Sequence, residues 1–299
     1  MKLTEKCFSA LLLLGLCLTS NCYAQANYPN RPIRLIIPFT PGGVTDTSGR
    51  FMAEQLSLKL GQQVIADNKP GASGNIGTQM VATAEPDGYT LLLGYAGTLS
   101  INPSLFDKVP FDSVKDFTPI GKIGDAILII VANNDFPGKT LGDVISISKK
   151  DPNGLSYGTS GSGGTPHIAG ELFKQKTGAN LVHVPYKGGG QALLDLLGGN
   201  IPLVYTAVAG ANQYVNTGRI KAIAVSSAKR SPSMPDVPTF VESGVKDFVI
   251  DDWVGLLAPA KTPKPIVTKL NQALNEILNS PEGKAKLLSM GIFPAPGSP

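Results

Sequence analysis

The sequence has few of the side chains that act as nucleophiles, redox centres or metal ligands. Its 299 residues include two histidines, His167 and His183, and three cysteines, at positions 7, 17 and 22. Two histidines without a nearby pair of acidic residues do not make the clustered ligand set of a metal site. We therefore expect no metal, no cofactor and no thiol chemistry.

The sequence also lacks a large excess of either positive or negative charge. Lysine and arginine number 26 against 22 aspartates and glutamates, a net charge of +4, with no long run of either sign. This argues against a nucleic-acid partner and against a membrane-surface footprint. Hydrophobic residues make up 42% of the chain, too much apolar material for a disordered protein. The length is enough for two domains with cores of their own.

No hydrophobic run is long enough to cross a membrane, which takes about 20 apolar residues in a helix. The longest, from Phe8 to Leu18, follows two lysines and precedes small and polar residues, the order that is typical of a secretory signal. We predict that residues 1–24 are a signal peptide, cleaved after residue 24 or 26, and that the exported chain holds no cysteine. Lipidation of Cys22 is the alternative, but Asn21 fits poorly before a lipidated cysteine.

The 34 glycines and 24 prolines separate short apolar runs from amphipathic stretches, an alternation that indicates an α/β fold. Near-continuous apolar runs are typical of parallel strands covered on both faces. We predict strands at residues 34–38, 64–66, 89–93, 127–131, 203–205, 220–225 and 253–257.

Helix boundaries can be predicted at three places. Residues 47–60 carry apolar side chains at helical spacing and stop at Gly61, which we expect to be a C-cap. Thr165 followed by Pro166 is typical of an N-cap with proline at the first helical position. A third helix is expected over residues 263–279.

Glycine-rich or proline-rich segments follow several of the predicted strands, at residues 38–43, 94–98, 158–164 and 185–190. In open α/β sheets, ligands bind at the carboxyl ends of the strands, where the first amides of the following helices favour an anion. A carboxylate held by such amides, and by hydroxyls of Thr45, Thr98, Ser160 and Thr165, needs no arginine. The alternative is that these glycines only permit tight turns.

Aromatic side chains accompany these loops. Tyr95, Tyr157, Tyr186 and Tyr205 lie in or beside them, and tyrosines give a binding cleft walls that are apolar with a polar tip. A tyrosine at a strand end can equally belong to the edge of the core, and Trp253 has the same ambiguity.

The sequence motifs of common α/β enzymes are incomplete. The segment Gly158-Thr-Ser160-Gly-Ser162 lacks the last glycine of a nucleophile elbow. Lys187 precedes its glycines, whereas the lysine of a phosphate-binding loop follows them. We expect no catalytic residues. An exported hydrolase that uses a serine of the 158–165 loop remains the alternative.

Ordered motifs from Tyr28 to the C-terminus resemble those of a known family. They are Tyr28-Pro-Asn-Arg-Pro-Ile-Arg34, Pro38-Phe-Thr-Pro-Gly-Gly-Val-Thr-Asp46, Asp67-Asn-Lys-Pro-Gly-Ala72, Gly74-Asn-Ile-Gly77, Pro86-Asp-Gly-Tyr-Thr-Leu91, Asp116-Phe-Thr-Pro-Ile120, His183-Val-Pro-Tyr-Lys-Gly188, Pro235-Asp-Val-Pro-Thr239 and Trp253-Val-Gly-Leu-Leu-Ala-Pro259. The chain resembles the substrate-binding receptors of tripartite tricarboxylate transporters, the Bug family of periplasmic binding proteins.

The resemblance implies a two-lobed, type II-like Venus flytrap fold in which each lobe is a mainly parallel sheet flanked by helices. Residues 27–124 and 247–299 would form lobe 1, and residues 125–246 lobe 2. It implies a periplasmic receptor that binds a small organic carboxylate between the lobes and delivers it to the membrane subunits of a transporter. We expect a monomer without enzymatic activity. A ligand sensor for a signalling partner shares this fold and stays open.

The resemblance also implies ligand contacts from both lobes. Asp46, near a helix start, is better explained as a cap or a brace of its loop than as a ligand contact. Thr206 stands where many relatives carry an acidic residue, which favours plain carboxylates over amino acids. The complete set of candidate ligand-binding residues is Thr40, Gly42, Gly43, Thr45, Asp46, Tyr95, Thr98, Tyr157, Ser160, Thr165, His167, Tyr186, Lys187, Gly188, Tyr205 and Thr206.

Overall fold

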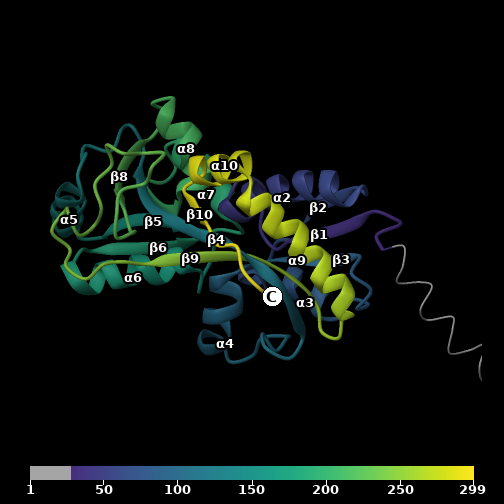
Figure 1. Cartoon of the computed structure of the whole chain (residues 1–299). Helices are drawn as coiled ribbons and strands as arrows, with labels where there is room; N and C mark the ends of the chain where they lie inside the picture. The colour runs from purple at the N-terminus through teal and green to yellow at the C-terminus, as the bar shows by residue number, and fades with distance from the viewer. Residues whose placement is uncertain (1–27) are drawn as a thin grey trace, which may run out of the picture.

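The computed structural model describes residues 28–299, and the predicted signal peptide lies outside these residues. Two groups of parallel strands, each flanked by helices, are joined by long antiparallel strands into one mixed α/β molecule (Figure 1). The strands are β1 (Ile33–Ile37), β2 (Val64–Asn68), β3 (Thr90–Tyr95), β4 (Phe117–Ala132), β5 (Leu155–Thr159), β6 (Leu181–Pro185), β7 (Leu203–Ala207), β8 (Lys221–Val225), β9 (Asp251–Pro259) and β10 (Ile292–Pro294). The two-lobed fold expected from the sequence is confirmed.

The helices fall mainly between these strands. They are α2 (Val44–Leu60), α3 (Asn75–Ala82), α4 (Asn102–Leu105), α5 (Leu141–Lys150), α6 (Thr165–Thr177), α7 (Gly189–Leu197), α8 (Val208–Asn216), α9 (Lys264–Asn279) and α10 (Pro281–Ser289), with a short 3-10 turn η1 (Ala72–Gly74) and a π-helical turn η2 (Gly97–Ile101). None of the described helices has both the length and the apolar character needed to cross a bilayer.

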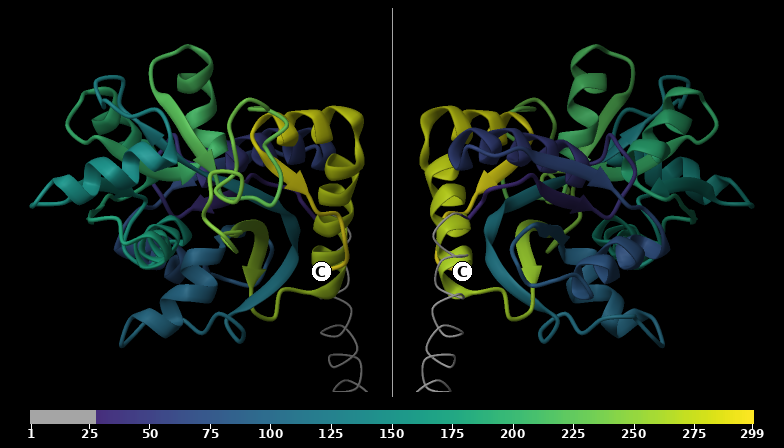
Figure 2. Two further views of the ribbon diagram at one scale, coloured as in Figure 1. Left: turned by 90° about the vertical axis from the view of Figure 1, so that its left-hand side faces the viewer. Right: turned by 90° about the vertical axis from the view of Figure 1, so that its right-hand side faces the viewer.

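The first lobe contains β1 paired in parallel with β2 and β3. Alternate residues of a strand point to opposite faces, so Leu35 packs into the same core as Leu56 of α2 and Leu270 of α9. Its neighbour Ile36 packs into a second cluster with Val81 of α3. The C-terminal helices α9 and α10 (yellow) lie beside α2, so both ends of the described chain build this lobe (Figure 2).

The second lobe contains β5 paired in parallel with β6 and β7. The same alternation operates on β7. Tyr205 packs with Phe173 of α6 in one core, whereas Val204 packs with Leu193 of α7 in another. Helices therefore cover both faces of the β5–β7 sheet.

The long strand β4 runs through both lobes. Its residues up to Ile127 pair with β9, and its residues 128–132 pair with β7 in an antiparallel ladder. The predicted strands at 127–131, 220–225 and 253–257 are thus present, but they lie in antiparallel ladders, not the parallel arrangement expected from their composition. Burial on both faces produces a continuous apolar run whichever way the neighbouring strand points.

The helix predictions can be compared with the structure end by end. Helix α2 starts at Val44, earlier than the predicted residue 47, and ends at Gly61, whose φ of 66° makes it the expected left-handed C-cap. Helix α6 starts at Thr165 itself, because Gly164 is its N-cap. The prediction that Thr165 is the N-cap is therefore wrong, and its hydroxyl serves another purpose that is described below.

Candidate functional site

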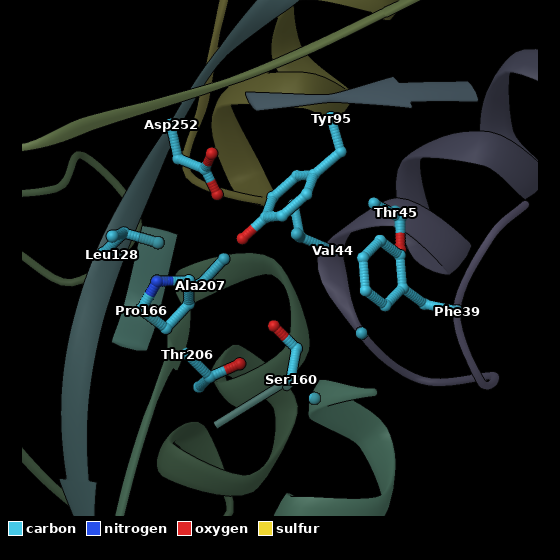
Figure 3. A pocket seen from close by; sticks show the side chains of 12 residues that line it. Phe39, Val44, Thr45, Tyr95, Leu128, Ser160, Pro166, Thr206, Ala207 and Asp252 are labelled. Carbon is cyan, nitrogen blue, oxygen red and sulfur yellow. The ribbon is translucent and has the colours of Figure 1, made fainter. Parts of the chain in front are cut away.

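A small cavity lies where the two lobes meet (Figure 3). The first lobe contributes residues from the β1–α2 loop, α2 and β3, and the second contributes residues from α6, α7, β7 and the loop after β5. The strands β4 and β9 contribute one residue each. The lining consists of Phe39, Gly43, Val44, Thr45, Tyr95, Leu128, Ser160, Pro166, Gly189, Thr206, Ala207 and Asp252.

Helix starts from both lobes face this cavity. Helices α2, α6 and α7 follow directly on the loops after β1, β5 and β6. Their N-caps are the glycines Gly43, Gly164 and Gly188, and no side chain caps any of these three helices. The first amides of α2 and α7 remain free to donate to a ligand, and the helix dipole adds a partial positive charge there. Helix α6 offers the Thr165 amide, because Pro166 has no N–H and the His167 amide donates to the Gly164 carbonyl at 2.9 Å. The site is therefore suited to an anion, as the positions of the glycine-rich loops predicted.

The backbones of the two lobes touch beside the cavity. Gly42 and Gly43 approach Gly189 and Gly190 closely enough that a Cβ on Gly43 would lie 3.5 Å from the Gly189 nitrogen. A Cβ on Gly190 would overlap the carbonyl oxygen of Pro41. Only glycine permits this approach at Gly190, so Gly190 is required for the observed contact between the lobes and not only for a turn.

Asp46 holds the β1–α2 loop in place. Its carboxylate accepts hydrogen bonds from the Gly42 amide, the Arg50 guanidinium and the Asn68 side-chain amide, each at 2.9 Å. The side chain is buried, and both of its oxygens are used within the first lobe. The carboxylate is a brace for the loop, the role that its place near the helix start suggested.

Asp252 of β9 lines the cavity and is absent from the candidate residues of the sequence analysis. It is fully buried, and its Oδ1 accepts a hydrogen bond of 2.9 Å from the Thr165 hydroxyl. Burial raises the pKa of this carboxyl to about 7, against the opposing effects of the Thr165 and Tyr95 hydroxyls. One sequence feature could have identified it, since an acidic residue stands directly before the predicted apolar strand at 253–257. Thr165 is thus held by Asp252 and is not itself in the lining.

Of the four candidate tyrosines, Tyr95 alone lines the cavity. Its ring contacts Phe39 edge to face, with 5.3 Å between centroids, and burial raises the pKa of its hydroxyl well above the ordinary value. Tyr157 donates to Glu171 at 2.9 Å and Tyr186 to Asp195 at 2.8 Å. Tyr205 is buried in the core of the second lobe.

The two histidines stack on each other behind the 158–164 loop. Their ring centroids are 4.0 Å apart, and burial lowers the pKa of both, that of His183 to about 4. His167 accepts from the Gly163 amide at 3.0 Å, and His183 pairs with the Thr159 hydroxyl at 2.7 Å. Neither ring bonds to a serine of the loop, so residues 28–299 contain no serine–histidine pair for the hydrolase alternative. No group of acids and histidines suited to a metal occurs in that range either.

The other candidates outside the lining serve the loops around it. Thr98 donates to the Ser73 carbonyl at 3.0 Å, and the exposed Lys187 donates its amide to Gln191 at 3.4 Å. Thr40 lies against Gly188, where the two lobes meet. Candidates that do line the cavity are Gly43, Thr45, Tyr95, Ser160 and Thr206; those that do not are Thr40, Gly42, Asp46, Thr98, Tyr157, Thr165, His167, Tyr186, Lys187, Gly188 and Tyr205.

Known proteins share both the sequence pattern and the fold of this chain. The family described as "Tripartite tricarboxylate transporter family receptor" (TctC) matches residues 49–298. BugT of Bordetella pertussis is 36% identical over 273 residues, which cover 91% of this chain and 84% of that protein. An R. palustris protein solved with adipate superposes with a TM-score of 0.88 at 36% identity, covering 91% of each chain. MatC from Rhodopseudomonas palustris with bound malate gives a TM-score of 0.83 at 32% identity, covering 89% and 90%.

Proposed function

The chain belongs to the tripartite tricarboxylate transporter family of receptors, and we propose that it is a periplasmic solute receptor that captures a small organic carboxylate between its two lobes. It then delivers the ligand to the membrane subunits of such a transporter. The protein binds and releases its ligand without chemical change. Its relatives in the family and among solved structures are binding proteins and not enzymes.

The observation that carries this proposal is the convergence of uncapped helix starts on one cavity. Gly43 at the start of α2 and Gly189 at the start of α7 come from different lobes and line the same space. The lining contains no lysine, arginine or histidine. Main-chain amides and hydroxyls are therefore the donors available to a carboxylate, and they bind it without a formal positive charge.

The ligands of two relatives support a small dicarboxylate. Adipate and malate, which occur in the solved R. palustris proteins, each carry two carboxylates. A dicarboxylate can be held at one end by the first lobe and at the other by the second.

We further propose that the lobes comprise residues 27–124 with 247–299, and residues 125–246, and that they close around the ligand by a hinge motion. The change of β4 partners after Ile127 supports a boundary in that part of the strand. A monomer is sufficient for this function, since residues of one chain enclose the cavity. Export to the periplasm would use the signal at residues 1–24.

A thermal-shift screen of the exported chain against mono-, di- and aromatic carboxylates tests the proposal. Binding to the native state stabilises it by about 2.7 kcal/mol at a hundredfold excess over Kd. We expect a clear rise in Tm with at least one dicarboxylate and none with the matching diol, which has the same carbon skeleton without the charge. The absence of any shift across the whole panel would contradict the proposed function.

A further inference from the structure

Asp252 is the one acidic side chain in the cavity lining, and one of its carboxyl oxygens has no hydrogen-bond partner among the described residues. Its Oδ1 is bonded to the Thr165 hydroxyl, whereas its Oδ2 has no hydrogen-bond partner among residues 28–299. The side chain is fully buried. The Asp252 carboxylate, the Tyr95 hydroxyl and the Ser160 hydroxyl point toward the same space (Figure 3).

The surroundings of Asp252 offer no counter-ion. Nearby titratable groups are Tyr95 of β3 and Asp125 of β4, which is itself paired with Lys122 at 2.6 Å. From α6 it faces the neutral hydroxyl of Thr165; His167, further along α6, is engaged by the Gly163 amide. An ionised carboxylate buried without a counter-ion is strongly disfavoured, and a second anion in the same cavity disfavours it further.

We propose that Asp252 contacts the bound ligand as a neutral acid, its Oδ2–H donating a hydrogen bond to a ligand carboxylate, so that capture of the anion is accompanied by uptake of one proton from solvent. This rests on the proposed function, since it requires an anionic ligand. The proton goes onto Asp252 when the ligand binds above the pKa of the free site, and returns to solvent when the ligand leaves. Asp252 is then a specificity-determining residue, because its hydrogen bond to a carboxylate is stronger than its hydrogen bond to a neutral acceptor.

The pH dependence of binding follows from this linkage. Burial raises the pKa of Asp252 to about 7 in the free protein. Below that pH the acid is already protonated and Kd is independent of pH; above it, Kd rises by up to about tenfold per pH unit. Neither the histidines nor Tyr95 changes charge between pH 7 and 9, because burial holds the pKa of both histidines below that range and that of Tyr95 above it.

The test is calorimetric titration with adipate, malate and the carboxylate that gives the largest Tm shift. At pH 8, the heat of binding is measured in two buffers with different heats of ionisation, which counts the protons taken up. We expect close to one proton per ligand for the wild type. Kd should be nearly constant from pH 5.5 to 6.5 and roughly 30- to 100-fold weaker at pH 9.

Asp252→Asn is the decisive variant, because its amide donates a hydrogen bond at every pH and carries no charge. We expect it to bind with wild-type affinity near pH 6 to within about threefold, to take up no proton, and to keep its affinity at pH 9. Asp125→Asn is the matched control: it removes a neighbouring acid outside the cavity lining and should retain proton uptake.

Two results would overturn the inference while leaving the proposed function intact. One is a wild-type protein that binds carboxylates with no proton uptake at pH 8. The other is an Asp252→Asn protein that loses affinity at every pH, which would mean that an ionised Asp252 accepts a hydrogen bond from the ligand. The wild-type measurement decides the matter even if the variant does not fold. Failure of every carboxylate to bind contradicts the proposed function itself, which is a different observation.

Discussion

At the scale of single residues, two buried carboxyl groups in or near the cavity have different roles. Asp46 and Asp252 are both buried, but Asp46 is satisfied by three donors and Asp252 by one. The number of donors decides their roles, because a satisfied carboxylate fixes its surroundings, whereas a partly satisfied one remains available to a ligand.

Replacing Asp252 by asparagine should stabilise the ligand-free protein at high pH. The pKa of Asp252 is about 7 in the folded state, above its ordinary value of 3.8. Between these two pH values the native state binds more protons than the unfolded state, so the free energy of unfolding falls as the pH rises through this range. The variant escapes this loss. We expect Asp252→Asn to exceed the wild type by about 1–4 kcal/mol at pH 8, and by much less at pH 4.5, in urea unfolding. Equal stability at pH 8 would argue against a raised pKa.

Removing the Asp46 carboxylate should loosen the β1–α2 loop. Asp46→Ala leaves the Gly42 amide without its acceptor and removes one of the two acceptors of the Asn68 side-chain amide, and we expect a loss of about 1–3 kcal/mol in the free energy of unfolding. Carboxylate affinity should also fall about tenfold or more, since Gly43 follows in the same loop. Arg50→Ala is the control. The arginine side chain is half exposed, so its loss should cost under about 1 kcal/mol.

The candidate site could be predicted in part from residue chemistry. Gly43, Thr45, Tyr95, Ser160 and Thr206 were identifiable because glycines, hydroxyls and a tyrosine follow predicted strands. Apolar members of the lining carry no such signal, since the same residue types also fill the core. Which of the tyrosines faces the cavity depends on which face of its strand it occupies, and that is settled by packing between distant segments.

At the scale of elements, local rules predicted the C-terminal ends of helices better than their starts or the directions of strands. The left-handed Gly61 ends α2 as expected, because a C-cap depends on residues a few positions apart. The direction of a strand's neighbour depends on the path of the whole chain. The ladder of β4 with β9 joins residues more than a hundred positions apart, so composition could indicate burial but not antiparallel pairing.

The C-cap of α2 gives a prediction of its own. Gly61 has φ of 66°, and a Cβ added there would meet no atom within 4 Å, so only backbone strain opposes a side chain at this position. Gly61→Ala should destabilise the protein by about 1 kcal/mol in urea unfolding, and Gly61→Asn by less, because asparagine tolerates the left-handed region. An equal loss for both variants would point to a cause other than φ. Ligand affinity should be unchanged in each.

At the scale of the whole molecule, contact between glycines of the two lobes defines the closed state. A Cβ on Gly190 would overlap the Pro41 carbonyl in the described structure, and the proposed hinge opening would relieve this overlap. Alanine is favourable within a helix, so the open state should tolerate it. We expect Gly190→Ala to leave the Tm of the ligand-free protein within about 2 °C of the wild type and to weaken carboxylate binding by about tenfold or more, because the ligand stabilises closure.

Gly142→Ala is the matched control for Gly190→Ala. Gly142 also lies in the first turn of a helix, α5, and a Cβ there would meet only the Thr140 hydroxyl, at 3.7 Å. It should bind as the wild type does. Small-angle scattering with and without ligand would show whether Gly190→Ala fails to compact. Wild-type affinity and compaction in that variant would contradict the role assigned to the glycine contact.

The course of β4 through both lobes limits how the molecule can open. This strand pairs with β9 up to Ile127 and with β7 from Leu128, so in the proposed hinge motion the lobes stay joined along it and separate by its bending or twisting. Asp252 pairs with Ala126, next to the place where β4 changes partner, so we expect it to move less between the open and closed states than the glycine loops do. Asp252 would therefore present its carboxyl group to an incoming anion from nearly the same position in the open and in the closed state.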